Sequence, residues 1–298
     1  MVARSSSSLD MKLPTLAIGT WKLGHSPEAE KDAIRLAIDK GIKCIDTAEI
    51  YHTEKLVGEA IKGSENIFVA TKVSPANFHH DDVLRACDRS LQSLGISCID
   101  LYQLHWPNNR VPIRETMSAM EELVNTGKVK HIGVSNFSID ELQEAQEAMR
   151  MHPIFSNQIE LSVLVRDAEK GMLQYCREND ILVLAYSPFS EGLLFKRYPK
   201  TLKLLEDIGK RHSKTAAQVT LNWLLCHDNV IPIVQMGRKE HVLENLDAID
   251  FRLSDEDMTL IGSNPERRRS NERRWGWLTK NTSLWAGLMG RSYSRKDR

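Results

Sequence analysis

The sequence has few of the features that mark membrane, secreted or nucleic-acid-binding proteins. No apolar run approaches the roughly 20 residues that a helix needs to cross a bilayer. The Ser-rich start, residues 1–12, also has no apolar stretch of the kind found in secretory signals. Forty basic and forty acidic residues give a formal net charge of zero, which argues against a chain that binds nucleic acid or a membrane surface as a whole. We therefore expect a soluble, cytoplasmic protein.

Cysteine is scarce as well. The chain has five cysteines, which are odd in number and scattered, and none of them forms a C-x-x-C pair. This pattern offers neither a disulfide framework nor a cysteine zinc site, and it is typical of free thiols in a reducing compartment.

Short apolar runs alternate with longer segments of helical period along most of the 298 residues. The runs are uniformly apolar, as expected of parallel strands that are buried on both faces. Ser138, three residues before Glu141, predicts a capping box at one helix start. The expected strands are 16–21, 43–47, 67–73, 99–106, 131–136, 155–161, 181–187 and 230–234. The expected helices are 28–40, 54–62, 80–94, 113–125, 138–149, 168–178, 201–226 and 240–248.

Eight strand–helix units predict an α/β fold, a single-domain (β/α)8 TIM barrel over residues 1–262. An open, doubly wound sheet is the alternative fold. That fold usually carries G-x-G-x-x-G after its first strand, whereas residues 20–24 here read TWKLG. In a barrel, catalytic and binding groups collect at the carboxyl ends of several strands.

The composition changes near Gly262. Residues 263–298 contain ten basic and three acidic residues, together with Trp275, Trp277 and Trp285. We expect this segment to be a basic, Trp-rich C-terminal tail. It could cover the barrel mouth, form a subunit interface, tether the protein to a membrane or nucleic acid, or remain a solvated extension.

Ionisable side chains stand at the ends of three consecutive expected strands. Asp46 ends the second strand, and Tyr51 follows it closely. Lys72 ends the third strand and His105 the fourth. Each alone has a structural explanation, such as a helix cap or a snorkelling lysine. Because neighbouring strand ends of a barrel lie within side-chain reach, we expect the four to form one cluster.

Such a cluster suits proton transfer to or from an oxygen atom. A phenol has a pKa near 10. A nearby ammonium should lower the pKa of Tyr51, and a carboxylate should keep that ammonium charged. Histidine can orient a carbonyl group. Metal binding is disfavoured because Lys72 would repel a divalent cation and no further His or Cys cluster offers ligands. A serine nucleophile is disfavoured because no G-x-S-x-G is present.

Several motifs, taken in order, resemble those of the aldo-keto reductase family. They are DTAEIY at 46–51, ATK at 70–72, DLYQLHWP at 100–107, IGVSNF at 132–137, NQIE at 157–160, AYSP at 185–188 and VIPI at 230–233. The resemblance covers about residues 16–260, and the short segment after 107 is similar to that of prokaryotic-type members. It implies an oxidoreductase with a (β/α)8 barrel that reduces aldehydes or ketones to alcohols with NAD(P)H.

The resemblance also implies a role for each matching residue. Tyr51 would be the proton donor, tuned by Lys72 and Asp46, and His105 would orient the substrate carbonyl. The substrate would contact Trp21, Tyr51, His105 and Trp106. The cofactor would contact Gly19, Thr20, Asp46, Ser135, Asn136, Gln158, Tyr186, Ser187, Gln235, Met236, Gly237, Arg238, His241, Glu244 and Asn245.

The segment that would bind the adenosine 2′-phosphate departs from the family pattern. Gln235, Met236 and His241 stand where the family has Lys, Ser and Arg. Arg238 and Lys239 lie nearby and are suited to bind the phosphate together with a helix N-terminus. We therefore favour NADPH, with NADH as the alternative.

Two functions remain open after this comparison of motifs. The first is a carbonyl reductase whose partner is a small carbonyl substrate, with no nucleic acid and no membrane involved. The second is a cofactor-binding regulatory subunit of the same fold, similar to channel subunits, with little turnover. The sequence does not define the oligomeric state.

Overall fold

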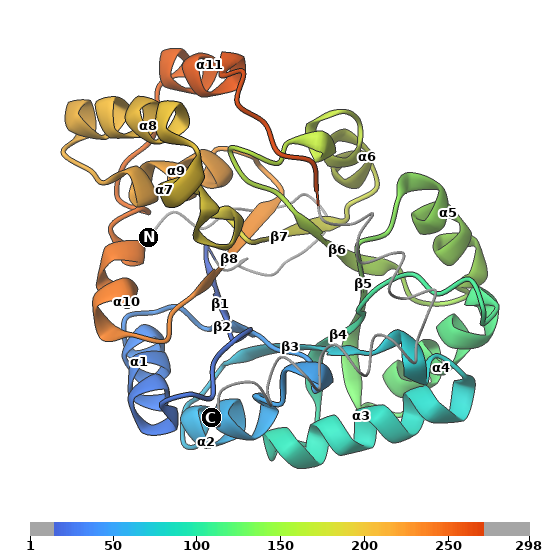
Figure 1. The fold of residues 1–298 in the computed structure, drawn as a ribbon. Coiled ribbons are helices and arrows are strands. Elements are labelled where there is room, and N and C mark those ends of the chain that lie inside the picture. Colours follow the sequence, from blue (N-terminus) through green and yellow to red (C-terminus); the bar gives the residue numbers. More distant parts are fainter. Residues whose placement is uncertain (1–14, 271–298) are drawn as a thin grey trace, which may run out of the picture.

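Eight parallel strands form a closed barrel in the computed structural model of the protein, which describes residues 15–270 (Figure 1). The strands pair in sequence order, and the first pairs with the eighth to close the barrel. This arrangement confirms the predicted (β/α)8 fold. The strands are β1 Ala17–Gly19, β2 Cys44–Asp46, β3 Phe68–Val73, β4 Ile99–Leu104, β5 Val129–Ser135, β6 Ile154–Glu160, β7 Leu182–Tyr186 and β8 Val230–Gln235.

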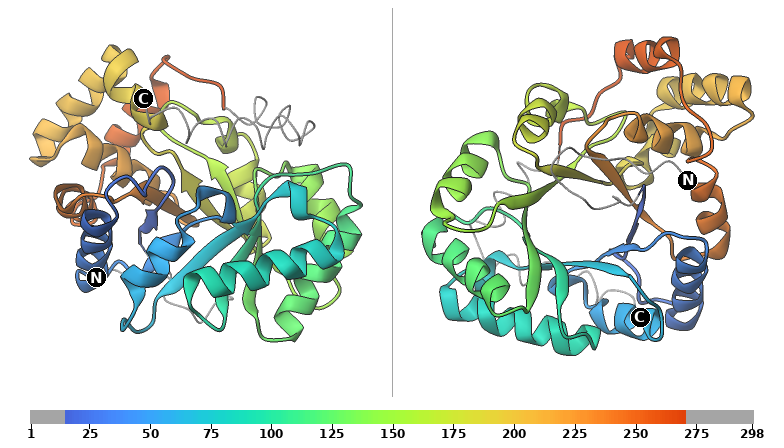
Figure 2. Two further views of the ribbon diagram at one scale, coloured as in Figure 1. Left: turned by 60° about the horizontal axis from the view of Figure 1, so that its bottom comes forward. Right: turned by 180° about the vertical axis from the view of Figure 1, so that it is seen from behind.

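Helices surround the barrel, and the two further views in Figure 2 show that α8 and α11 stand outside the ring on the side of β7 and β8. The α-helices are α1 Pro27–Asp39, α2 Glu54–Ile61, α3 His80–Leu94, α4 Ile113–Asn125, α5 Ile139–Ala148, α6 Met172–Glu178, α7 Leu193–Arg197, α8 Pro199–His212, α9 Ala216–Leu225, α10 Lys239–Leu246 and α11 Asp255–Ser263. Four 3-10 turns, η1 Glu49–Tyr51, η2 Pro75–Asn77, η3 Asp167–Glu169 and η4 Ser190–Gly192, lie in loops.

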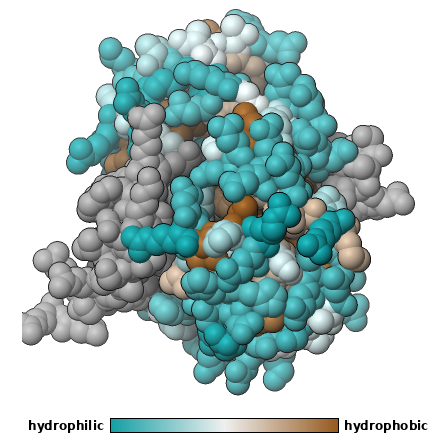
Figure 3. All heavy atoms as spheres, turned by 90° about the vertical axis from the view of Figure 1, so that its right-hand side faces the viewer, coloured by the Kyte–Doolittle hydropathy of each residue, from teal (hydrophilic) through white to brown (hydrophobic). Residues whose placement is uncertain are grey.

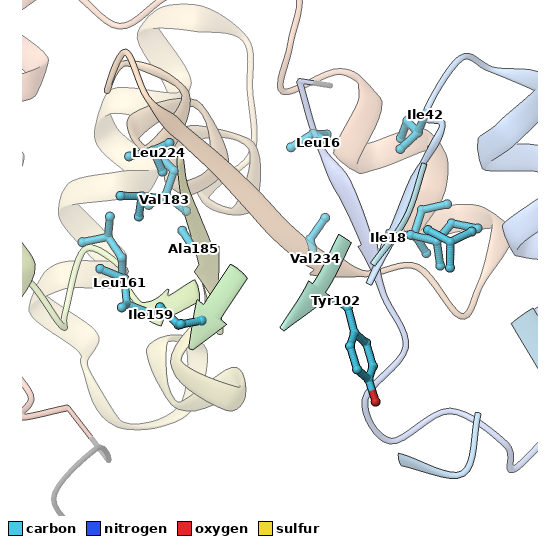
Figure 4. Close-up of a cluster of buried hydrophobic side chains, with 14 of the residues drawn as sticks. Leu16, Ile18, Ile42, Tyr102, Ile159, Leu161, Val183, Ala185, Leu224 and Val234 are labelled. Carbon is cyan, nitrogen blue, oxygen red and sulfur yellow. The ribbon is translucent and has the colours of Figure 1, made fainter. Parts of the chain in front are cut away.

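The alternation of side chains along each strand divides the interior into two layers. Outward residues such as Ile18, Val183 and Val234 pack against the helices, where they meet side chains such as Leu224 of α9 (Figure 4). Inward residues near the amino ends of the strands form a smaller apolar cluster inside the barrel. That inner cluster contains Ala17, Cys44, Ala70, Leu101, Phe155, Leu182, Leu184, Ile231 and Ile233.

The outer surface is mainly polar. The face in Figure 3 is predominantly hydrophilic, and its apolar patches are small. Met151, Phe195 and Leu243 are the large apolar side chains that are exposed among residues 15–270. In the same part of the chain, no helix has the length and apolar character needed to cross a bilayer.

Local capping explains where several helices begin and end. The predicted capping box is confirmed: the Ser138 N–H donates to Glu141 Oε2 (2.8 Å), and the Glu141 N–H donates to Ser138 Oγ (3.3 Å). The expected single helix over 201–226 is wrong. Ser213 adopts the left-handed conformation (φ 54°), and Thr215 starts a new helix with a capping box of its own, so the segment forms α8 and α9.

The segment after α11 continues along the carboxyl-end side of the barrel. We call residues 264–270 the C-terminal strap. The strap runs from α11 towards the ends of β6 and β7 (Figures 1 and 2), and the Arg268 N–H donates to the Leu164 carbonyl (2.8 Å). The predicted boundary at residue 262 falls just before the end of α11. Most of the expected tail, including Trp275, Trp277 and Trp285, lies outside the described residues.

Close packing of α2 on α3 depends on Gly58. A Cβ atom at this position would lie 2.3 Å from the backbone oxygen of Leu94. We expect Gly58→Ala to lower the free energy of unfolding by roughly 1–3 kcal/mol, because overpacking outweighs the higher helix propensity of alanine. Chemical denaturation measures the change. Ser93→Ala, on an exposed position of α3, is the control and should leave the midpoint unchanged. An unchanged midpoint for Gly58→Ala would show that the two helices can separate freely.

Candidate functional site

A cavity of about 300 Å³ opens at the carboxyl ends of the strands. Several inward side chains there, such as Asp46 and Gln158, are polar, in contrast to the apolar cluster below them. The residues that line this cleft come from several strand ends and are far apart in the sequence. They include Gly19, Trp21, Asp46, Tyr51, His105, Trp106, Ser135, Asn136, Gln158, Glu160, Tyr186, Ser187 and Gln235.

A buried ion pair lies at the base of the cleft. Lys72 is fully buried, and its Nζ donates to Asp46 Oδ2 (2.7 Å) and to the Thr47 carbonyl (2.8 Å). The other carboxylate oxygen of Asp46 accepts a hydrogen bond from Gln158 Nε2 across the barrel (2.8 Å). Burial lowers the pKa of Lys72, and the Asp46 carboxylate opposes this effect. The pair thus ties β2, β3 and β6 together at one point.

Tyr51 and His105 face each other above this ion pair. Tyr51 sits on the turn η1 that follows β2, and its hydroxyl lies 3.3 Å from Nε2 of His105. The two rings meet edge-on, with their centroids 5.4 Å apart. The Nζ atom of Lys72 lies 4.9 Å from the centre of the Tyr51 ring. The structure therefore brings the four predicted catalytic residues into one cluster.

The protonation states of Tyr51 and His105 follow from their burial. Burial, and then the negative charge of Asp46, raise the pKa of Tyr51 well above its ordinary value. Burial, and then the positive charge of Lys72, lower the pKa of His105 well below its ordinary value. At neutral pH the site therefore holds a neutral phenol and a neutral imidazole. The expectation that an ammonium lowers the pKa of Tyr51 is wrong here, because burial and the nearby carboxylate dominate.

A chain of hydrogen bonds joins the ends of β5, β6 and β7 beside this cluster. The Tyr186 hydroxyl donates to Asn136 Oδ1 (2.8 Å), and Asn136 Nδ2 donates to Ser135 Oγ (2.9 Å). Ser135 Oγ donates in turn to the Gln158 carbonyl (2.9 Å). Asn136 adopts a left-handed conformation (φ 65°), and its Nδ2 also donates to the His105 carbonyl (3.2 Å). These contacts fix the orientation of a set of amide and hydroxyl groups at the edge of the cleft.

The first loop contributes one wall of the cleft. Gly19 and Trp21 line it, and Trp106 lines it from the other side, after β4. Thr20 is different: its side chain is buried and donates to the Asp46 carbonyl (3.0 Å), so it supports the cleft from behind.

The predicted adenosine-binding segment extends from the cleft to α10. Gln235 lines the cleft, and its Nε2 donates to the Trp21 carbonyl (2.8 Å). Met236 is fully buried in the hydrophobic core, so its side chain does not face the cleft. Gly237 packs against Leu23, where a Cβ atom would lie 2.6 Å from the leucine side chain.

The charged residues of this segment differ in their surroundings. Arg238, the N-cap of α10, and His241 in its first turns are both exposed. Lys239 instead pairs with Asp32 of α1 (3.1 Å). Glu244 accepts a hydrogen bond from Thr215 (3.0 Å), and Asn245 is buried. Of the two cations expected near a phosphate, only Arg238 is left without an ion-pair partner among residues 15–270.

Several cleft residues were not predicted from the sequence. Phe189 and Glu191 come from the loop after β7, whose path no local motif defines. Glu160 could have been found, because it follows Gln158 by two residues on the same strand and so points to the same side. No group of three or more His, Cys, Asp or Glu side chains within residues 15–270 is arranged to hold a metal ion.

Comparisons with known proteins agree with this geometry. The model of the Aldo/keto reductase family matches residues 15–264. The chain is similar to Methylglyoxal reductase YeaE of Escherichia coli (strain K12), with 32% identity over 85% of this chain and 91% of that protein. It is also similar to Glyoxal reductase of Bacillus subtilis (strain 168), with 34% identity over 84% of this chain and 88% of that protein.

Solved structures show the same relationship. The thermostable aldo-keto reductase Tm1743, solved with the inhibitor epalrestat, superposes with a TM-score of 0.83 at 39% identity, over 88% of this chain and 99% of that one. An aldo-keto reductase from Klebsiella pneumoniae in complex with NADPH gives a TM-score of 0.82 at 30% identity, over 90% and 97% of the two chains. The matched family model, these similarities and the shared barrel show that the chain belongs to the aldo/keto reductase family.

Proposed function

We propose that this protein reduces aldehydes or ketones to alcohols with NADPH, and that Tyr51 is the general acid. The observation that carries the proposal is the meeting of the Tyr51 hydroxyl and His105 Nε2 at 3.3 Å inside the cleft. Both groups are neutral, so a phenol proton is available at neutral pH. A carbonyl oxygen between them would find two hydrogen-bond donors at once.

The residues beside this cluster fit a nicotinamide cofactor. The ring of Tyr186 is partly exposed to the cleft, and its hydroxyl is fixed by Asn136 (2.8 Å). Ser135, Asn136 and Gln158 offer amide and hydroxyl groups that suit a carboxamide. A similar reductase from Klebsiella pneumoniae was solved with NADPH. When bound, NADPH supplies the hydride that the reduction requires.

The protein's own groups would then act on the substrate oxygen. His105 donates a hydrogen bond from Nε2 and orients the carbonyl. Tyr51 donates a hydrogen bond to the same oxygen and transfers its proton as negative charge develops there. The ion pair of Lys72 and Asp46 fixes the strand ends beneath and places a positive charge near the phenolate that remains. After the alcohol is released, the Tyr51 phenolate regains a proton from solvent.

The shape of the cleft favours small or apolar carbonyl compounds. Trp21, Trp106 and Phe189 provide apolar walls, and two similar proteins are named reductases of methylglyoxal and glyoxal. A regulatory subunit with little turnover is not favoured, because the four groups of the cluster are present and in contact. All five cysteines are free thiols, which supports the proposed cytoplasmic location.

Removal of the proton donor tests the proposed mechanism. We expect Tyr51→Phe to lower kcat for aldehyde reduction by about 10²–10⁴-fold, because general acid catalysis contributes about this much. The Kd for NADPH, measured by fluorescence titration, should stay close to that of the unmodified protein. Trp21→Phe, which retains an aromatic wall, is the control and should mainly change KM. Retention of most of the turnover in Tyr51→Phe would exclude Tyr51 as the acid.

The raised pKa of Tyr51 predicts the pH dependence. A group whose pKa lies above the assay pH stays protonated, so kcat/KM for reduction should be nearly constant from about pH 6 to about pH 9 and fall only in more alkaline solution. His105 should cause no change in this range, since its lowered pKa keeps it neutral. A steady-state pH profile checks this expectation. A tenfold loss already below about pH 8 would mean that the phenol is more acidic than its surroundings imply.

Cofactor preference depends on Arg238 in this proposal. Arg238 is exposed at the N-terminus of α10, where a phosphate would also meet the helix dipole. We expect Arg238→Ala to raise KM for NADPH about tenfold, because a charge-assisted phosphate contact contributes roughly 1.5–3 kcal/mol. KM for NADH should change little. Lys239→Ala, which removes a cation that is already paired with Asp32, should have a much smaller effect. An equal effect of both substitutions would argue for a diffuse field instead of a phosphate contact.

A further inference from the structure

Hydrogen bonds hold both the end of α11 and the C-terminal strap that follows it. Arg166, from the loop after β6, donates from Nη1 to the carbonyls of Ile261 (2.9 Å) and Gly262 (3.0 Å) at the end of α11. Further along, Glu266 Oε2 accepts hydrogen bonds from the N–H (2.8 Å) and the hydroxyl (2.7 Å) of Thr201 at the start of α8. These contacts hold the strap in a defined path before it reaches the cleft.

Arg268 then meets a carboxylate of the cleft wall. Its Nη1 donates to Glu160 Oε1 (2.8 Å), while its backbone N–H donates to the Leu164 carbonyl (2.8 Å). Ser270 Oγ donates to the other oxygen, Glu160 Oε2 (3.3 Å). The side chain of Glu160 is 1% exposed and that of Arg268 14% exposed, so water screens this pair only weakly.

Glu160 occupies an important place in the proposed site. It is the last residue of β6, it lines the cleft, and it pairs in register with Tyr186 of β7. Gln158, two residues earlier on the same face, holds Asp46. A net charge at Glu160 would therefore act inside the cleft, in a poorly screened environment.

We propose that Arg268 is a specificity-determining residue, which balances the charge of Glu160 and thereby sets how well the cleft accepts anionic carbonyl substrates. The inference rests on the proposed carbonyl reductase function. With both residues present, their charges largely cancel at the cleft wall. Loss of Arg268 leaves more negative charge there and disfavours an anionic substrate, whereas loss of the Glu160 charge leaves an excess of positive charge and favours it.

Two matched substrates test this charge balance. We use 4-carboxybenzaldehyde, which is anionic, and 4-nitrobenzaldehyde, which is neutral, and we measure the ratio of their kcat/KM values at about pH 8, where a free carboxylic acid is ionised. We expect Arg268→Ala to lower the anionic-to-neutral ratio about tenfold and Glu160→Gln to raise it by a similar factor. The double variant, which carries neither charge, should return to within about threefold of the original ratio.

Control variants separate charge from structure. Arg269→Ala removes the exposed neighbouring cation and should not change the ratio. Arg268→Lys keeps the charge and should largely preserve it. Thermal unfolding of each variant identifies any that fail to fold, and the double variant retains the test if Arg268→Ala is unstable on its own.

The outcomes are distinct. A lower ratio in Arg268→Ala that the double variant restores supports the inference. An anionic-to-neutral ratio that is unchanged in both Arg268→Ala and Glu160→Gln would overturn the inference. A ratio that Arg268→Lys lowers as much as Arg268→Ala would overturn it too, and Arg268 would then be a purely structural anchor. Failure of the proposed function appears separately, because the unmodified protein would then not reduce the neutral aldehyde with NADPH at all.

Discussion

The buried contact between Lys72 and Asp46 is the constraint on which the rest of the site depends. Lys72 is fully buried, and its ammonium is held by one carboxylate oxygen of Asp46 while Gln158 binds the other. Removing two charges from water is costly, and apolar replacements of such pairs are often at least as stable. We therefore infer that the role of the pair is to fix the ends of β2, β3 and β6 relative to one another, and not to add net stability. Tyr51 follows β2, and His105 follows β4, which pairs with β3, so the mutual position of the two side chains depends on this fixed frame.

Side chains that point into the barrel have different roles at the two ends of the strands. Inward residues at the amino ends of the strands, such as Ala17, Cys44 and Leu101, fill the interior with apolar atoms. Inward residues a few positions later, such as Asp46 and Gln158, present polar atoms to the cleft. Burial, and then the charges of Asp46 and Lys72, account for the raised pKa of Tyr51 and the lowered pKa of His105, because the charged forms of these two groups have little solvent to stabilise them.

Much of this arrangement could be predicted from the sequence, because strands that are buried on both faces leave clear apolar runs and because the polar residues that end them stand out. The four-residue cluster was accessible for this reason. The break between α8 and α9 was missed: Ser213 gives no local sign of a left-handed conformation, but Thr215 with Gln218 three residues later is a capping-box pattern that marks a helix start. The direction of the pKa shift of Tyr51 depends on burial in the folded barrel, which no local pattern encodes. The contact between Glu160 and Arg268 joins residues that are 108 positions apart, so no local pattern encodes it either.

The cap of α8 has a consequence for how the chain acquires its structure. The helix has no side-chain cap of its own, and the carboxylate of Glu266, 65 positions further along, accepts the hydrogen bond from Thr201 instead. A chain that leaves the ribosome from its N-terminus exposes α8 well before this carboxylate is made. The first turn of α8 therefore gains its carboxylate cap only after Glu266 has been synthesised and has folded back onto Thr201, so this helix start reaches its full stability later than the helix itself is made.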